Sequence, residues 1–289
     1  MRTITYIAVP LRQGAEKRGT ELAPQSLWEG AKEIIRRYAQ VEQVALPLPE
    51  IRTEAPAKYA DMAQYMRQLK QTVQACMDDS LPFTVGGDHA LGLGTVAAAA
   101  ARYEDLGVIW FDAHGDMNTE ATSHTGHIHG MPLAAAMGLC ASELNEVADR
   151  HIQPEHIFWV GTRSLDEGEQ ALAKQLNLHV YSAQTVREQG MPYVMEQIQA
   201  ELQRLHIRHL HVSIDIDAMD PQIVPATGVP ETQGLNNTEY EQFVDRLLWL
   251  PAQLSSMDFV EYNPLLDDEA QHTKQWCLYA IERLMKAIR

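Results

Sequence analysis

Short apolar runs alternate along the chain with longer stretches in which apolar residues recur at helical spacing. The short runs, rich in Val, Ile, Phe or Trp, predict strands, and the longer stretches predict helices. The expected strands are 3–9, 82–85, 107–111, 157–160, 209–216 and 256–260. The expected helices are 24–40, 58–79, 91–102, 190–205, 237–249 and 269–288. This alternation predicts an α/β fold with a mainly parallel sheet flanked by helices on both faces.

Clusters of polar residues close or follow most of the predicted strands. They lie at 86–89, 112–116, 161–169, 215–220 and 261. Open parallel sheets bind ligands at the carboxyl ends of their strands, so these clusters predict one shared functional site.

The chain has 289 residues, and no low-complexity tract or Pro/Gly/Ser-rich linker divides it. We therefore expect one continuous domain over residues 1–289. The formal net charge of −16 argues against a nucleic acid or an anionic membrane as partner, because both require a basic surface. The same charge is compatible with a small cationic substrate.

The cysteines Cys76, Cys140 and Cys277 are far apart, and they indicate neither a disulfide framework nor a structural zinc site. The apolar run at 3–9 is too short for a signal sequence, and no run approaches the length of a membrane span. A cytoplasmic location is the default expectation.

The polar clusters contain six candidate metal ligands, four carboxylates and two imidazoles. They are His89, Asp112, His114, Asp116, Asp215 and Asp217. In an extended chain, residues two apart project on the same face, so each acidic segment can direct its side chains to one point. Four like charges in such a cleft raise one another's pKa unless cations neutralise them. Two divalent metal ions would do so.

Oxygen and nitrogen donors without thiolate favour a hard ion such as Mn²⁺ over structural Zn²⁺. Two such ions can hold a bridging hydroxide as nucleophile, which is the chemistry of a hydrolase. The alternative is that each aspartate is a helix cap or a turn residue. For Asp220, which precedes Pro221, we favour that alternative.

Four segments resemble, in order and spacing, the signature segments of the ureohydrolase family, which includes arginases and agmatinases. They are GGDHA at 86–90, WFDAHGDMNT at 110–119, SIDIDAMDP at 213–221 and EYNP at 261–264. The resemblance covers nearly the whole chain and implies that the six candidate ligands hold two Mn²⁺ ions. It also implies a single arginase-like three-layer α/β/α catalytic domain and assembly into homotrimers or homohexamers.

Two further segments are similar to bacterial-type arginases and unlike agmatinases. They are NTEATSHTGHIHGMPL at 118–133 and GTRSLDEGE at 161–169. The expected reaction is therefore hydrolysis of L-arginine to L-ornithine and urea by a metal-bridging hydroxide.

The resemblance also implies which residues hold the amino-acid end of the substrate. Asn118 and Thr125 would bind the α-carboxylate, and Asp166 and Glu169 would bind the α-ammonium. His127 stands where arginases usually have Asn, and it would lie against the α-carboxylate. The alternative for Asp166 and Glu169 is a helix N-terminus, where acidic side chains complement the helix dipole.

At the guanidinium end, the resemblance implies that His129 shuttles a proton, that Glu261 pairs with the guanidinium and that Asp116 contributes to catalysis. A guanidinium has a pKa above about 12 and is a poor electrophile, so the enzyme must supply both hydroxide and a proton for the leaving amine. An imidazole suits the proton transfer, and a carboxylate matches the guanidinium fork.

Val229 and Gln233 depart from the family pattern in the segment at 225–234, which leaves the exact guanidino substrate open. An agmatinase or a guanidino-acid hydrolase with the same metals is the first alternative. A catalytically silent relative is disfavoured because the six ligands are present together with His129 and Glu261. A zinc-dependent deacetylase is disfavoured because such enzymes use one metal.

Overall fold

The computed structural model describes residues 3–55 and 57–288. Within these residues the strands are β1 Thr3–Val9, β2 Gln40–Ala45, β3 Leu81–Gly86, β4 Leu106–Phe111, β5 Ile157–Val160, β6 His179–Tyr181, β7 His209–Asp215 and β8 Gln253–Val260. In the described part of the chain they form one eight-stranded sheet in the order β2-β1-β3-β8-β7-β4-β5-β6. Every neighbouring pair is parallel, which confirms the predicted α/β fold.

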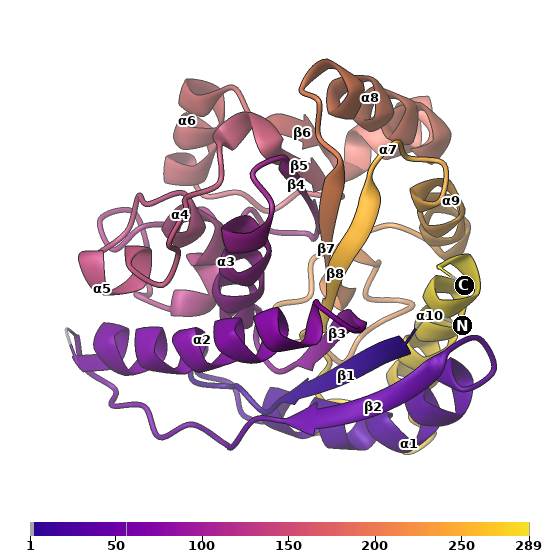
Figure 1. Ribbon diagram of the computed structural model, residues 1–289, viewed down its shortest axis with the longest axis horizontal. Helices are drawn as coiled ribbons and strands as arrows, with labels where there is room; N and C mark the ends of the chain where they lie inside the picture. Colours follow the sequence, from indigo (N-terminus) through magenta and orange to yellow (C-terminus); the bar gives the residue numbers. More distant parts are fainter. Residues whose placement is uncertain (1–2, 56, 289) are drawn as a thin grey trace.

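The helices lie on both faces of this sheet (Figure 1). They are α1 Ala23–Ile35, α2 Ala57–Cys76, α3 Gly92–Arg102, α4 Pro132–Ala136, α5 Ser142–Asn145, α6 Glu167–Leu176, α7 Ala183–Gln189, α8 Met191–Arg204, α9 Asn237–Leu247 and α10 His272–Ala287. Helices α1 and α7 to α10 pack on one face, and α2 to α6 pack on the other. Among the described residues, no helix has the length and apolar character needed to cross a membrane.

The central strands are continuous apolar runs because both of their faces are covered. Every residue of β3, β4 and β5 is buried. Along β4, Ile109 and Phe111 point into the core beneath α8 and α9, whereas Val108 and Trp110 point into the core beneath α3. Each apolar side chain of these strands therefore has a helix to pack against, which is the usual situation in parallel sheets.

The two edge strands were not predicted. Strand β2 is almost entirely exposed and reads QVEQVA, and β6 has only three residues. Edge strands need no continuous apolar run, since one side and much of their surface meet water. The predicted helix at 24–40 was too long for the same reason, because α1 ends at Ile35 and the chain has already entered β2 at Gln40. The short helices α4 to α7 were also missed.

The strand order places the functional edge of the sheet. Strands β7 and β8 lie between β3 and β4, so the carboxyl ends of these four central strands are neighbours. All four predicted polar clusters that follow them, from 86–89 to 261, therefore face one region.

Candidate active site

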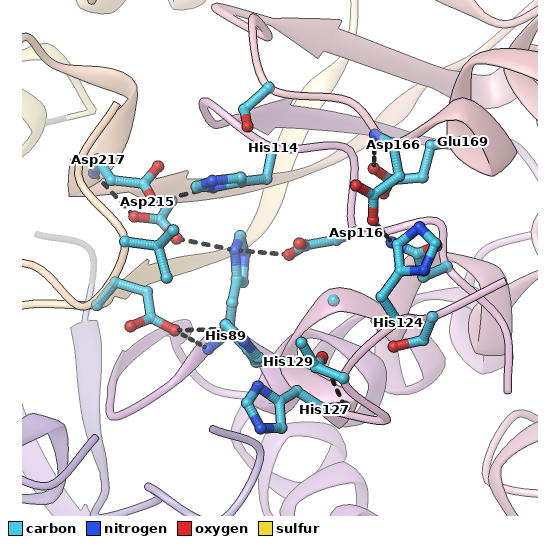
Figure 2. Close-up of a pocket in the computed structure, with 17 residues that line it drawn as sticks. His89, His114, Asp116, His124, His127, His129, Asp166, Glu169, Asp215 and Asp217 are labelled. Carbon is cyan, nitrogen blue, oxygen red and sulfur yellow. Dashed lines mark hydrogen bonds and ion pairs between the residues drawn. The ribbon is translucent and has the colours of Figure 1, made fainter. Parts of the chain in front are cut away.

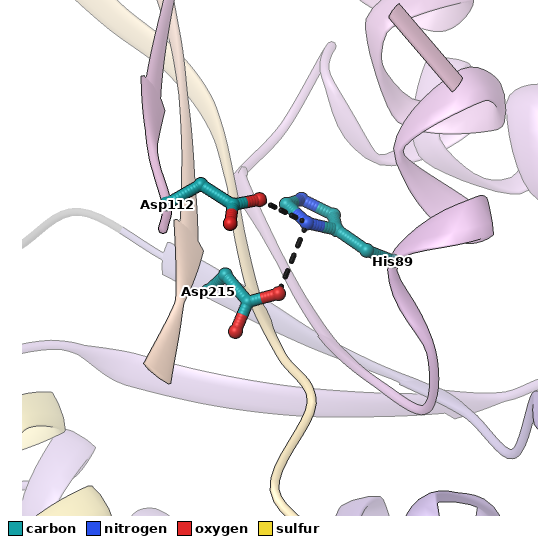
Figure 3. Close-up of side chains that lie close together, drawn as sticks. All are labelled: His89, Asp112 and Asp215. Carbon is teal, nitrogen blue, oxygen red and sulfur yellow. Dashed lines mark ion pairs between the residues drawn. The ribbon is translucent and has the colours of Figure 1, made fainter. Parts of the chain in front are cut away.

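A cavity of about 280 Å³ opens at the carboxyl edge of the central strands (Figure 2). Twelve of the predicted site residues line it: His89, His114, Asp116, Asn118, Thr125, His127, His129, Asp166, Glu169, Asp215, Asp217 and Glu261. The remaining one, Asp112, is fully buried and lies against His89 (Figure 3). The structure thus brings together every residue that the sequence indicated, while their individual roles stay predictions.

Local turns, and not an extended chain, aim the aspartates. Asp112 accepts a hydrogen bond on Oδ1 from the backbone N–H of His114 at 2.7 Å. Asp215, at the end of β7, accepts on Oδ1 from the N–H of Asp217 at 2.8 Å, where a 3₁₀ turn begins. Asp217 in turn accepts on Oδ1 from the N–H of Ala113 at 3.2 Å. The prediction of an extended chain was wrong here, because short carboxylates readily accept bonds from backbone groups two residues on.

Asp116 and Glu261 have left-handed backbones, with φ of 52° and 68°. This region is unfavourable for residues with a Cβ and typically costs about 1–3 kcal/mol. Both side chains lie in the cavity, so the strain coincides with the site.

The second oxygens of the four aspartates face the imidazoles. His89 Nδ1 lies 2.9 Å from Asp112 Oδ2, 3.1 Å from Asp116 Oδ2 and 3.2 Å from Asp215 Oδ2 (Figures 2 and 3). His114 Nδ1 lies 3.1 Å from Asp217 Oδ2.

Three of these buried atoms, His89 Nδ1, Asp112 Oδ2 and Asp116 Oδ2, make no hydrogen bond of acceptable geometry within the described residues. They converge on a common point without bonding to one another. Buried polar atoms are normally satisfied, so this arrangement is what ligands around a cation require.

The charges of the cluster are strongly perturbed. Burial, followed by the charge of Asp112, raises the pKa of Asp116 to about 6. Burial, followed by the charges of Asp217 and Asp112, raises the pKa of Asp215 well above its usual value. Burial disfavours the charged form of His89, yet the carboxylates around it raise its pKa well above the usual value. The cluster therefore favours bound positive charge, as protons or as metal ions.

Two overlapping groups of ligand atoms are close enough to hold metal ions. One comprises His89, Asp112 and Asp215, and the other Asp112, His114 and Asp217. In each group the ligand atoms lie within 4.8 Å of one another. Because Asp112 belongs to both, the arrangement fits two neighbouring ions that share a carboxylate, and its oxygen and nitrogen donors fit a hard divalent metal.

The turn that carries His89 is tied to the loop after β1. Asp88, which sequence reasoning missed, accepts hydrogen bonds from the N–H of Gly14 at 2.7 Å and of Ala90 at 3.1 Å. Gly14 has no room for a side chain, since a Cβ would lie 2.4 Å from Asp88 Oδ1. The carbonyl of Gly14 accepts from the N–H of His129. Asp88 thereby links the His89 turn to the segment that carries His129.

His129 and Glu261 share the wall beside this turn. Glu261 accepts on Oε1 from the backbone N–H of His89 at 2.8 Å, and the same oxygen lies 3.8 Å from His129 Nδ1. Burial would lower the pKa of His129, but the carboxylate of Glu261 and the charges of Asp88 and Asp116 raise it to about 9. His129 therefore holds a proton at neutral pH in the metal-free cluster.

At the opposite end of the cavity, Asn118, Asp166 and Glu169 form one hydrogen-bonded group. Asn118 Nδ2 donates to Asp166 Oδ2 at 2.9 Å. Glu169 accepts on Oε1 from the N–H of Met117 and on Oε2 from the N–H of Asp166, both at 3.0 Å. Asp166 is the N-cap of α6, so the helix N-terminus considered for this segment is present. Burial raises the pKa of Glu169 to about 7.

The mouth of the cavity is looser. Thr125 is exposed, and its hydroxyl accepts from the backbone N–H of His127. His127 Nε2 lies 3.4 Å from a carboxylate oxygen of Glu16, an exposed residue of the loop after β1. Burial, followed by the charge of His129, lowers the pKa of His127, so its imidazole is neutral at neutral pH. His124, which was not predicted, also lines this end.

Arg163 is a second residue that sequence reasoning missed. Its guanidinium donates to the backbone carbonyls of Gly161, Asp217, Ala218, Met219, Glu231 and Thr232. These bonds fasten the turn at 217–219 to the loop at 231–232. A single cation inside the acidic segment at 161–169 was the available signal, because an arginine there needs several acceptors.

Comparison with known proteins agrees with this geometry. A sequence model of the Arginase family matches residues 2–286. An arginase from Bacillus caldovelox is 36% identical over 284 residues, covering 93% of each chain. The crystal structure of Entamoeba histolytica arginase with L-ornithine has a TM-score of 0.92 at 33% identity and covers 98% of each chain. A hypothetical agmatinase from Burkholderia thailandensis is more distant, with a TM-score of 0.73 and 22% identity over 99% of this chain and 85% of the other, and shows the fold alone.

We expect Glu169→Gln to change how stability depends on pH. The folded-state pKa of about 7 lies above the ordinary value of 4.5, so the folded protein binds this proton more tightly than the unfolded chain. The stabilisation is complete below about pH 4.5 and is lost as pH rises through about 7, an effect on the order of 2–3 kcal/mol. Urea unfolding of metal-free protein should show this loss in the parent and not in the variant. Glu167→Gln, an exposed change in the same helical turn, is the control, and parallel profiles for parent and Glu169→Gln would contradict the assignment.

Proposed function

Because the chain belongs to the arginase family of ureohydrolases, we propose that it hydrolyses the guanidinium group of L-arginine to give L-ornithine and urea. The observation that carries this proposal is the shared cavity: two overlapping groups of metal ligands at one end, and a set of polar groups for an amino acid at the other. The Bacillus caldovelox relative is an arginase, and the Entamoeba histolytica arginase was solved with L-ornithine, which supports the same substrate here.

We further propose that the cofactor is a pair of Mn²⁺ ions held by His89, Asp112, His114, Asp116, Asp215 and Asp217. The family is metal-dependent, and the unbonded ligand atoms of the cluster support this assignment. When bound, the ions supply the positive charge that the carboxylates require and activate water as the nucleophile. The side chains must then hold the substrate carbon in position and deliver a proton.

Glu261 is proposed to bind the guanidinium. It is buried, its backbone is fixed in the left-handed region, and the N–H of His89 restrains one of its oxygens. A carboxylate so restrained pairs with a planar guanidinium at low entropic cost and orients the electrophilic carbon toward the metal ligands.

His129 is proposed to supply the proton that the departing amine needs. Its side chain is partly exposed at the cavity wall, and the carboxylate of Glu261 keeps it protonated. An amine cannot leave as an anion, so proton donation at this point lowers the barrier.

The amino-acid end is proposed to follow the family pattern in part. The amide of Asn118 and the hydroxyl of Thr125 would bind the α-carboxylate, and Asp166 would bind the α-ammonium. Glu169 has both oxygens occupied by backbone N–H groups, so we propose that it acts by holding Asp166 in place. His127, as a neutral imidazole, can donate to the carboxylate in the way the amide of an Asn would.

One observation favours the alternative of an agmatinase or guanidino-acid hydrolase. Glu16 lies against His127 at the mouth, where an anionic side chain disfavours the carboxylate of an amino acid. A homotrimer or homohexamer, a cytoplasmic location and the absence of nucleic-acid and membrane partners stay predictions.

The metal proposal predicts about two Mn²⁺ per chain after loading and removal of excess metal, measured by elemental analysis. Asp217→Asn should retain about one ion and lose activity by orders of magnitude, because it removes a charge from only one of the two ligand groups. A parent protein that is fully active with one ion would contradict the binuclear centre.

The substrate proposal predicts that L-arginine has a higher kcat/KM than agmatine, guanidinobutanoate and formiminoglutamate. Product release by Mn²⁺-loaded protein measures all four. His127→Asn should leave this order unchanged, because both side chains offer a neutral donor. If agmatine or guanidinobutanoate is preferred by the parent and loses that preference in Glu16→Gln, the alternative specificity replaces the arginase proposal.

The proton-donor proposal predicts that His129→Ala lowers kcat by about 10²–10⁴-fold with a smaller change in KM. Steady-state kinetics with L-arginine test this split, and added imidazole should restore part of the rate. A kcat within about threefold of the parent would show that His129 only packs against Glu261.

A further inference from the structure

A chain of buried polar side chains extends from His89 away from the cavity. Its members lie on β7, β8 and α3, and each is at most 1% exposed: Thr95, His211, Ser213, Ser256 and Asp258. Sheet register sets their positions, because His211 faces Ser256 and Ser213 faces Asp258 across the β7–β8 pair. The proposed reaction uses none of them.

The chain begins at the metal-facing imidazole. His89 Nδ1 points at the carboxylates of the cluster, and its other nitrogen, Nε2, lies 2.8 Å from Ser213 Oγ. The Ser213 hydroxyl donates to Asp258 Oδ2 at 3.3 Å. With its own proton directed to Asp258, Ser213 accepts the Nε2–H of His89. This order of bonds fixes the tautomer that leaves Nδ1 as a ligand.

Asp258 is itself held from two further sides. The same oxygen accepts from Thr95 Oγ1 at 2.7 Å and faces His211 Nε2 at 3.1 Å, and His211 Nδ1 lies 2.8 Å from Ser256 Oγ. Asp258 Oδ1, by contrast, has no hydrogen-bond partner within the described residues.

This one-sided satisfaction argues for a role of the charge. A buried carboxylate with an unbonded oxygen costs stability, and neutral residues would fill the same space more favourably. A cation held by His89 would compensate for the charge, because the Ser213 bridge connects the carboxylate to the ligand.

The ring of His89 is restrained in a second direction. It stacks on Trp110, with ring centroids 4.1 Å apart and planes inclined by 3°. Stacking fixes the plane of the ring, but leaves its rotation within that plane to the bond at Nε2. Ser213 and Asp258 control this remaining freedom.

We propose that Asp258 is a positioning residue of the metal centre, acting through Ser213 to orient His89 and strengthen it as a ligand. This rests on the proposed metal centre. Hydrogen-bond partners of metal-bound imidazoles typically change metal affinity by about 10–100-fold.

The test is a Mn²⁺ titration of metal-free protein that resolves two affinities for the parent. Asp258→Asn, which keeps the size and removes the charge, should weaken one affinity by about 10–100-fold and leave the other unchanged. Ser213→Ala should weaken the same one. The double variant should show no further loss beyond the larger single effect, since Asp258 acts through Ser213.

Ser256→Ala is the matched control. It removes a bond to His211 from the same buried network without touching Ser213 or Asp258, so both affinities should stay within about threefold of the parent. Thermal unfolding of the metal-free variants separates loss of fold from loss of affinity. If Asp258→Asn fails to fold, Ser213→Ala decides the outcome.

Parental affinities in Asp258→Asn and Ser213→Ala, equal weakening of both ions, or additive losses in the double variant would each overturn the proposal. A parent protein that binds no metal would instead refute the metal centre itself, and the inference with it.

Discussion

The need to hold four carboxylates together in a buried site constrains this molecule more than any other feature. Asp112, Asp116, Asp215 and Asp217 come from two strand ends, and their repulsion is large enough to raise the pKa of Asp116 and Asp215. Each of the other three gives one oxygen to a nearby backbone N–H and keeps the second for the centre. The fold can therefore orient like charges only because rigid turns follow buried strands.

Rigidity decreases from this centre outward. His89 is fixed by a stacked tryptophan and a buried hydroxyl, and Glu261 by a backbone bond and a strained φ. At the mouth, Thr125 is exposed and His127 faces an exposed Glu16. The reacting end is thus built into the sheet, whereas the end that distinguishes one guanidino compound from another lies on loops. Such a division allows specificity to change without disturbing the catalytic groups.

Much of this could be predicted from sequence, because buried parallel strands and metal ligands both leave distinctive patterns. The central strands were found as apolar runs, and His89, Asp112 and Asp215 were found as ligand types directly after them. The edge strands were missed because they are polar. The left-handed backbones of Asp116 and Glu261, and the partnership of Ser213 with Asp258, were also out of reach. They depend on backbone geometry and on a register between strands about forty residues apart, which no local pattern records.

The strand order has a consequence for how the chain acquires its active site. Strands β7 and β8, the last two along the sequence, occupy the middle of the sheet between β3 and β4. Residues 3–205 can form the two flanks, but these flanks share no strand pairing until the later strands insert. Pairing across such sequence separations is slow, since a large loop must close before any contact forms. A partly folded chain therefore has nowhere for the ligands to meet, and metal capture marks the completion of folding.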